Sequence, residues 1–320
     1  MPIDLILASY SDLAYNTALA LYLLAMALHA VEYAAGRVPG AATARRAVPE
    51  GDGPIATMAA PPSTAPRSRS ERVGRSAVAL TGLAVLVHAS SLVLRGAATG
   101  RAPWANMYEF ISAICLAAVA GWLVVLYRQR SAPNNGPAAL RRLGTFVLLP
   151  VVALMFLGGT VLYAQAAPLV PALNSYWITI HVSAAAGASG ILLISGVASI
   201  LYLFSIRPGS GVAARLPSTA TLDRLAYRTT VIALPIWTFA VITGAIWAEA
   251  AWGRYWGWDP KETFALVAWV VYAGYLHARA TAGWRGPRAA WINVVGLAVM
   301  LFNLFFVNIV IAGFHSYAGI

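Results

Sequence analysis

The sequence predicts an all-α integral membrane protein with about eight transmembrane helices and an outward-facing, tryptophan-rich loop. Of its 320 residues, 60% are hydrophobic and only 10% are charged, whereas soluble domains carry about 25% charged residues. The apolar residues form runs of about 20, the length that an α-helix needs to cross a bilayer. We expect such helices near residues 13–35, 77–95, 106–127, 145–164, 176–205, 230–248, 262–280 and 290–313.

The first apolar run is expected to be a retained span and not a cleaved signal peptide. No basic segment precedes it, and the chain begins with the acidic residues Asp4 and Asp12, which is atypical of secretory signals. Residues 1–36 are therefore predicted to form an N-terminal transmembrane helix.

Residues 37–75 are rich in Ala, Pro, Gly, Ser and Arg and contain almost no large apolar residues. A segment of this composition cannot bury enough apolar surface to fold. We predict a disordered cytoplasmic linker over 37–75, followed by a seven-helix domain over 76–320 that carries the tryptophan-rich loop at 249–262.

The basic residues predict how the helices are oriented. Eighteen of the 22 Lys and Arg lie in four gaps that share one side of the membrane, at 37–75, 128–142, 207–228 and 279–288. Because positively charged loops stay in the cytoplasm, both termini and the tryptophan-rich loop are expected on the outer face. The formal charge of +11 then reflects topology and does not indicate a nucleic-acid-binding surface. The remaining four basic residues are Arg95, Arg101, Arg254 and Lys261.

A single cysteine, Cys115, lies inside an apolar run. One cysteine excludes a disulfide framework, a CxxC redox pair and a zinc site, so we expect Cys115 to be a small core residue. A CxxCH haem-attachment motif is also absent from the sequence, which excludes a c-type cytochrome.

The tryptophan-rich loop concentrates four ring side chains within seven residues and interleaves them with two glycines. A bilayer interface explains one or two tryptophans, because the ring is apolar and its N–H needs a polar partner. Four together predict a flat surface that lies against a large planar partner such as haem, and an ordinary aromatic belt is the alternative. The four rings are Trp252, Tyr255, Trp256 and Trp258.

Charged residues of the same loop have two candidate roles. Asp259, which is followed by Pro260, is a favourable helix N-cap and could also belong to the haem site. Arg254 and Lys261 could pair with the propionates of a haem.

Histidines provide the candidate ligands, because ionisable residues within a membrane usually serve a function and imidazole is a common axial ligand of haem iron. His181 and His315 lie near the outer ends of their spans, and we predict that they are the two axial ligands of an outer site. His277 lies deeper, roughly 22 Å below the outer surface, and is a candidate intramembrane ligand. His88, near the middle of its span, is a further candidate, and His29 lies at a depth similar to that of His277.

Ordinary structural roles are the alternatives for these histidines. His315 could be a hydrogen-bonded surface residue, and His277 could form a hydrogen bond to a neighbouring helix. The side chain of His29 could extend toward the membrane–water interface.

Around these residues the sequence resembles a known family. WGRYWGWDPKETFALVAWVVYAGYLHAR resembles the tryptophan-rich "WWD" signature of the haem-handling proteins of cytochrome c biogenesis, in particular the CcsA/ResC type of the System II pathway. SYWITIHVSAAAG and AGFHSYAG resemble the two outward-facing haem-ligand segments of that family, and YLHAR resembles its intramembrane ligand segment. HASSLVLRGAATGRAPWANMYEF is similar to an early span and loop of the family, so the resemblance covers most of residues 77–320.

The resemblance implies a membrane haem-handling subunit of the bacterial plasma membrane. Such a subunit receives or exports haem b and presents it on the outer face to the CxxCH motif of apocytochrome c, as part of a two-subunit holocytochrome c synthase (haem lyase). The implied partners are a ResB-type membrane protein, apocytochrome c, membrane lipid and, indirectly, a thiol-reducing thioredoxin-like protein. The ResB-type partner would supply the second ligand opposite His277.

Two other functions compete with this interpretation. One is a haem b electron-transfer subunit of a quinone-linked respiratory complex. Such subunits typically carry paired histidines on one helix, whereas no predicted span here contains two. The other is a transporter with an aromatic gate, which explains the spans but gives the histidines near the loop no function.

Overall fold

The computed structural model describes residues 3–35, 68–130, 136–207, 213–281, 283–311 and 313–315. These residues form α-helices and two short 3-10 turns, with no strand among them. The long helices are α1 (Leu5–Ala35), α2 (Arg69–Thr99), α3 (Met107–Arg128), α5 (Gly144–Thr160), α6 (Tyr176–Ser205), α7 (Thr219–Trp252), α8 (Pro260–Thr281) and α9 (Pro287–Leu304). The short elements are α4 (Gly136–Arg141), α10 (Phe306–Ile309) and the 3-10 turns Pro171–Leu173 and Ala213–Arg215.

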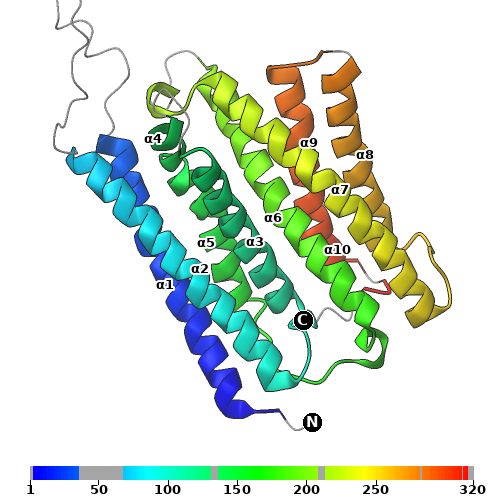
Figure 1. Cartoon of the computed structure of the whole chain (residues 1–320). Coiled ribbons are helices and arrows are strands. Elements are labelled where there is room, and N and C mark those ends of the chain that lie inside the picture. The colour runs from blue at the N-terminus through cyan, green and yellow to red at the C-terminus, as the bar shows by residue number, and fades with distance from the viewer. Residues whose placement is uncertain are drawn as a thin grey trace, which may run out of the picture.

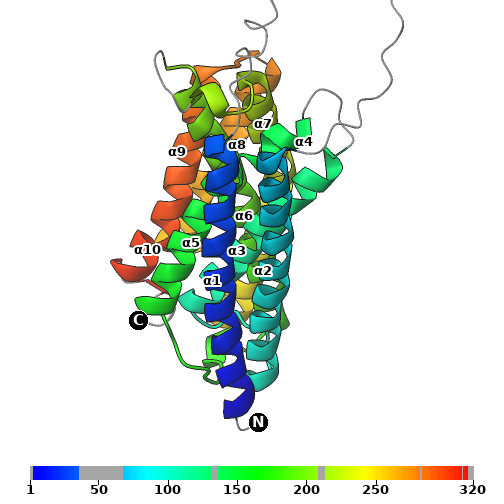
Figure 2. The ribbon, with the colours of Figure 1, turned by 90° about the vertical axis from the view of Figure 1, so that its left-hand side faces the viewer.

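Successive long helices run antiparallel in an elongated bundle (Figures 1 and 2). Helix α1 packs along α2, α6 along α7, and α8 along α9. Helices α3 and α6 join these pairs, because α3 contacts α5 and α6, and α6 also contacts α9. The start of α1, the end of α2 and the loop between α7 and α8 therefore lie at the same end of the bundle (Figure 1).

Seven helical segments of the described chain are long and apolar enough to cross a membrane. They are α1, α2, α3, α6 and α7, together with Ala138–Thr160 and Pro287–Ile309. The remaining expected span, 262–280, corresponds to α8, whose 22 residues cover about 33 Å, but which is less apolar because it carries Lys261, Glu262 and Arg279. The predicted all-α membrane fold is confirmed.

Helices α2 and α7 begin earlier than the sequence predicted, in both cases because a serine caps them. The side chain of Ser68 accepts a hydrogen bond from the Glu71 N–H (3.2 Å), so α2 begins at Arg69 and residues 69–75 of the expected linker are helical. In the same way Ser218 caps α7, which makes this helix longer than the expected span 230–248. Residues 36–67 of the predicted linker lie outside the described residues.

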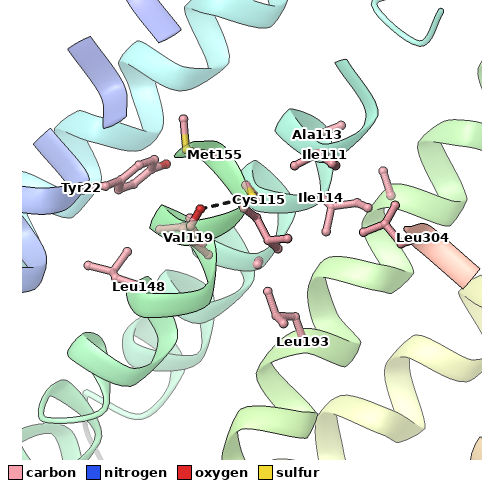
Figure 3. Close-up of a cluster of buried hydrophobic side chains, with 14 of the residues drawn as sticks. Tyr22, Ile111, Ala113, Ile114, Cys115, Val119, Leu148, Met155, Leu193 and Leu304 are labelled. Carbon is pink, nitrogen blue, oxygen red and sulfur yellow. Dashed lines mark hydrogen bonds between the residues drawn. The ribbon is translucent and has the colours of Figure 1, made fainter. Parts of the chain in front are cut away.

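Figure 3 shows the packed core between α1, α3, α5 and α6. Cys115 is fully buried there, and its Sγ lies 3.7 Å from the carbonyl oxygen of Val151. Tyr22, Leu148 and Met155 surround it (Figure 3). The prediction that Cys115 is a small core residue is confirmed.

Candidate functional site

Figure 1 shows the end of the bundle that carries the loop between α7 and α8, and residues at this end line a cavity. Its walls come from the loop before α3, from helices α3, α5 to α10 and the 3-10 turn Pro171–Leu173, and from His315, and most of the lining side chains are apolar or aromatic. The lining follows α6 from His181 to Leu193, which corresponds to about 18 Å of helix. The cavity therefore extends from the loop end of the bundle well into the membrane-spanning region.

His181 lies in the second turn of α6, and its ring is held from two sides. Its Nδ1 lies 2.7 Å from the carbonyl oxygen of Ala240, and because a carbonyl can only accept, Nδ1 carries the proton and Nε2 keeps its lone pair. The ring stacks on Trp247 with the centroids 6.2 Å apart and an interplanar angle of 8°. Gly244 leaves room for it, since a Cβ there would lie 2.7 Å from His181 Nδ1.

His315, which lies 134 residues after His181 in the sequence, lines the same cavity. Its Nδ1 lies 3.1 Å from Oδ1 of Asp259, and its ring meets Trp252 edge to face at 5.2 Å. The second oxygen of Asp259 accepts a hydrogen bond from the Phe314 N–H (2.7 Å). Asp259 thus fixes both the backbone and the imidazole of residues 314–315.

Asp259 also caps α8, as the sequence predicted. Its Oδ1 accepts from the Lys261 N–H (2.9 Å), and its carbonyl oxygen accepts from the Thr263 N–H (2.9 Å). Burial raises the pKa of this carboxyl group. Hydrogen bonds from His315 and from the N–H groups of Lys261 and Phe314 lower the pKa by more than burial raises it, so the pKa lies below its usual value. The group is therefore ionised at neutral pH.

The rings of the tryptophan-rich loop divide between the cavity and the exterior. Trp252, Tyr255 and Trp256 line the cavity, whereas Trp258 does not and is 69% exposed. Trp256 and Trp258 meet at 90°, so the rings do not form one flat surface as the sequence led us to expect. Trp258 has φ 58, a left-handed conformation that is unusual for a bulky residue and turns its ring away.

The two basic residues of the loop occupy different positions. Lys261 lines the cavity, and its Nζ donates to the carbonyl oxygen of Asn303 (3.0 Å). The guanidinium of Arg254 lies outside the lining and packs over the ring of Phe314 at 4.5 Å.

The other histidines lie away from this cavity. His277 is exposed on α8, near the opposite end of that helix. His88 is fully buried on α2, where Nε2 lies 2.8 Å from the hydroxyl of Ser112 and Nδ1 lies 3.3 Å from that of Tyr22. His29 is buried on α1, 3.8 Å from Glu32.

Sequence reasoning missed several residues that shape the cavity. Trp247 lies between the two outer histidines, 6.2 Å from the ring of His181 and 5.8 Å from that of His315. Its place five residues before Trp252 was the available signal. Asn303 also lines the cavity, and an amide within an apolar run could have indicated it. Trp104 contributes a wall from the loop before α3.

A buried ion cluster holds that last loop in place. The Glu109 carboxylate, fully buried at the start of α3, accepts hydrogen bonds from Arg95 Nε (3.0 Å), Arg101 Nη1 (2.9 Å) and the Ala105 N–H (2.8 Å). A second nitrogen of Arg95 donates to the carbonyl oxygen of Ala164. One carboxylate thus ties α2 and the loop segment 101–105 to α3.

Comparison with known proteins identifies the family. Residues 104–315 match the model of the cytochrome C assembly protein family. The chain is 38% identical to the cytochrome c biogenesis protein CcsA of Parasynechococcus marenigrum over 264 residues, which cover 74% of this chain and 85% of that protein. It is 36% identical to the Chlamydomonas reinhardtii protein of the same name over 243 residues, which cover 74% and 67% of the two chains.

A solved structure shares the fold. The cytochrome c haem lyase CcmF superposes with a TM-score of 0.58 at 17% sequence identity, over 95% of this chain. This chain spans about half (47%) of that longer chain. Together with the fold and the match to the family model, these relatives show that the chain is a multi-pass membrane protein of cytochrome c biogenesis and belongs to the cytochrome c assembly protein family.

Proposed function

We propose that this chain is the haem-handling subunit of a System II cytochrome c synthase. It receives or exports haem b and presents it on the outer membrane face for thioether attachment to the CxxCH motif of apocytochrome c. The observation that carries the proposal is that His181 and His315 line one aromatic cavity, and that Nδ1 of each lies at an oxygen acceptor.

Histidines that bind a metal usually donate their other ring N–H to a carbonyl or carboxylate, which fixes the tautomer and the ring orientation. Ala240 provides that acceptor for His181, and Asp259 provides it for His315. In the proposal these two histidines are the axial ligands of the haem iron at the outer site, and Asp259 is the positioning residue of His315.

The surrounding side chains suit a porphyrin with two carboxylates. Trp252, Tyr255 and Trp256 supply aromatic walls, and Lys261 brings a positive charge into the cavity. Arg254, beside Phe314, is the second basic residue that pairs with a propionate. The exposed ring of Trp258 is available to the protein that approaches from outside.

The intramembrane haem site at His277 is proposed to be shared with another chain. The side chain of His277 is exposed on α8, so a ResB-type membrane partner can reach it and supply the ligand opposite. His88 remains a weaker candidate, because binding iron would require one of its hydrogen bonds, to Tyr22 or to Ser112, to break.

This chain contributes to the chemistry by positioning the haem relative to the substrate thiols. When the cysteines of apocytochrome c attach to haem, each S–H adds across one vinyl group, so that no oxidant is consumed. A thiol-reducing thioredoxin-like protein contributes indirectly by keeping these cysteines reduced. One axial histidine of this chain would then yield to the histidine of the substrate motif, which would release the product from the two-subunit complex at the outer membrane face.

The proposal is tested by the reduced absorption spectrum of the purified chain, co-expressed with its ResB-type partner. The wild type is expected to show a b-type spectrum with two histidine ligands. The double variant His181→Ala/His315→Ala is expected to lose the haem of the outer site, and cells that carry it are expected to lack c-type cytochromes. His88→Gln is the matched control, since His88 does not line the cavity, and it should keep the outer haem.

Other outcomes would indicate the competing functions. Haem-free wild-type protein from haem-replete cells would contradict the ligand assignment and favour a transporter with an aromatic gate. Normal c-type cytochromes in the double variant, together with altered quinone-linked electron flow, would favour a respiratory subunit.

A further inference from the structure

A second cavity, here called the side cavity, lies beside the main cavity that contains His181 and His315. It is formed where the loop before α3 meets the start of α6, and three side chains line both cavities: Trp104, Leu173 and Ile178. Of its seven other lining residues, five are polar: Arg101, Asn174, Ser175, Tyr176 and Thr179. Because Asn174 and Tyr176 are exposed, the side cavity is open to the surface. The start of α6 lies at the same end of the bundle as the tryptophan-rich loop (Figure 1).

Hydrogen bonds fix the walls of the side cavity. Arg101 donates to the carbonyl oxygen of Ala167 from Nε (3.2 Å) and Nη2 (3.0 Å), and to the Glu109 carboxylate from Nη1 (2.9 Å). This arginine thus joins the loop before α3 to the loop before α6. On the other side, the indole N–H of Trp247 donates to the carbonyl oxygen of Ala172 (3.0 Å) in the 3-10 turn before α6. The same indole stacks on a proposed haem ligand, so one ring supports both cavities.

The side cavity presents neutral hydrogen-bond donors. The indole N–H of Trp104, which can only donate, is buried without a partner among the described residues. The first N–H groups of α6 also border this cavity, and such groups have no partner within their own helix. Arg101, the charged residue of the lining, is paired with the Glu109 carboxylate. Neutral donors match neutral acceptors, and a peptide main chain supplies one carbonyl oxygen per residue.

We propose that the side cavity binds the CxxCH-bearing segment of apocytochrome c, with the main chain of that segment along the start of α6; this inference rests on the proposed haem-handling function and deepens it. The segment lies at the end of the bundle where, in the proposed function, the substrate arrives. The shared side chains Trp104, Leu173 and Ile178 separate it from the main cavity. Its carbonyl groups accept from the donors of the side cavity, and its cysteine side chains extend past Trp104 toward the haem. The polar cavity holds the peptide and the aromatic cavity holds the porphyrin.

Filling the side cavity tests whether the peptide binds there. Thr179 lines the side cavity but not the main one, so Thr179→Trp occupies space that the peptide needs and leaves the haem ligands in place. The full-length chain, co-expressed with its ResB-type partner and loaded with haem, is mixed with a synthetic peptide that carries reduced CxxCH, and thioether formation is followed spectroscopically. We expect this variant to keep the wild-type haem spectrum. It should need roughly tenfold more peptide for half-maximal attachment, which corresponds to about 1.4 kcal/mol of binding.

Thr160→Trp is the matched control, because Thr160 is exposed at the end of α5 and lines neither cavity. This variant should behave as the wild type. Equal peptide requirements of Thr179→Trp and Thr160→Trp would overturn the peptide site. Loss of haem in Thr179→Trp alone would also overturn it, because the side cavity would then be part of the haem site.

A photo-crosslinker reports peptide binding without relying on haem. Tyr176 lines the side cavity and is 68% exposed, whereas Tyr10, on α1, is 55% exposed and lines neither cavity. With Tyr176→benzoylphenylalanine, irradiation should join the CxxCH-bearing peptide to the chain, and with Tyr10→benzoylphenylalanine it should not. Capture of the ResB-type partner at position 176 without a peptide adduct would overturn the peptide site. A haem-free wild type that still gives the adduct at position 176 would overturn the proposed haem site but support the peptide site, so the two failures are distinguishable.

Discussion

At the scale of single residues, the site depends on side chains that orient others. Asp259 is the clearest case, because one carboxylate caps α8, binds the Phe314 N–H and holds His315. Gly244 acts by the absence of a side chain, since the ring of His181 occupies the space where a Cβ would lie. Both residues orient a candidate ligand of the haem iron and are not ligands of the iron themselves.

Gly244→Ala is expected to displace the ring of His181. The added Cβ would lie 2.7 Å from the imidazole, and overpacking of this kind costs about 1–3 kcal/mol. We expect haem affinity to fall roughly tenfold or more by the same principle, together with a changed ligand-field spectrum, both measured by haem titration. Gly274→Ala on α8 is the control, because nothing lies within 4 Å of its added Cβ. Equal effects of the two variants would contradict the role assigned to Gly244.

At the scale of elements, the cavity walls are held by polar contacts between helices and loops. The loop before α3 supplies Trp104 and Asn106 to the cavity, and the Glu109 carboxylate ties this loop to α2 and α3 through Arg95 and Arg101. Removing one partner of a buried ion cluster leaves the other charges uncompensated, which is more costly than losing an exposed pair.

Glu109→Gln is therefore expected to destabilise the chain by about 3 kcal/mol, because Arg101 would lose its anionic partner and Arg95 would keep only Asp12, 3.6 Å away. Thermal unfolding of the purified protein in detergent measures this loss. The control is Glu71→Gln, which removes an exposed pair with Arg75 (3.9 Å) and should change stability by less than about 1 kcal/mol. A Glu109→Gln protein as stable as this control would show that the cluster does not hold the loop.

At the scale of the whole molecule, the antiparallel bundle places the tryptophan-rich loop and the start of α1 at one end (Figures 1 and 2), where the cavity also lies. Among the described residues, the Lys and Arg of 69–75, 128–142, 207–228 and 279–288 lie at the other end (Figure 1). The positive-inside rule therefore predicts that the cavity faces outward, which is where the proposed function requires it.

Single-cysteine labelling tests this orientation. The native Cys115 is fully buried, so it should contribute little background. Tyr255→Cys, at an exposed position of the tryptophan-rich loop, should react with a membrane-impermeant maleimide added to intact cells. Ala280→Cys, at an exposed position near the other end of α8, should react only in inverted vesicles. The reverse pattern would show that the cavity faces the cytoplasm.

The sequence by itself determined the membrane class, the helical fold, the approximate spans and the group of aromatic and histidine residues on one side. These properties are local or additive, since hydropathy, helix caps and charge bias depend on residues close together in the chain. The tertiary structure alone decided which of those residues meet. His181 meets Ala240 and His315 meets Asp259 across separations of 59 and 56 residues, and Asn303 faces Lys261 across 42. Such contacts depend on how antiparallel helices align and rotate against one another, and no local pattern encodes that alignment.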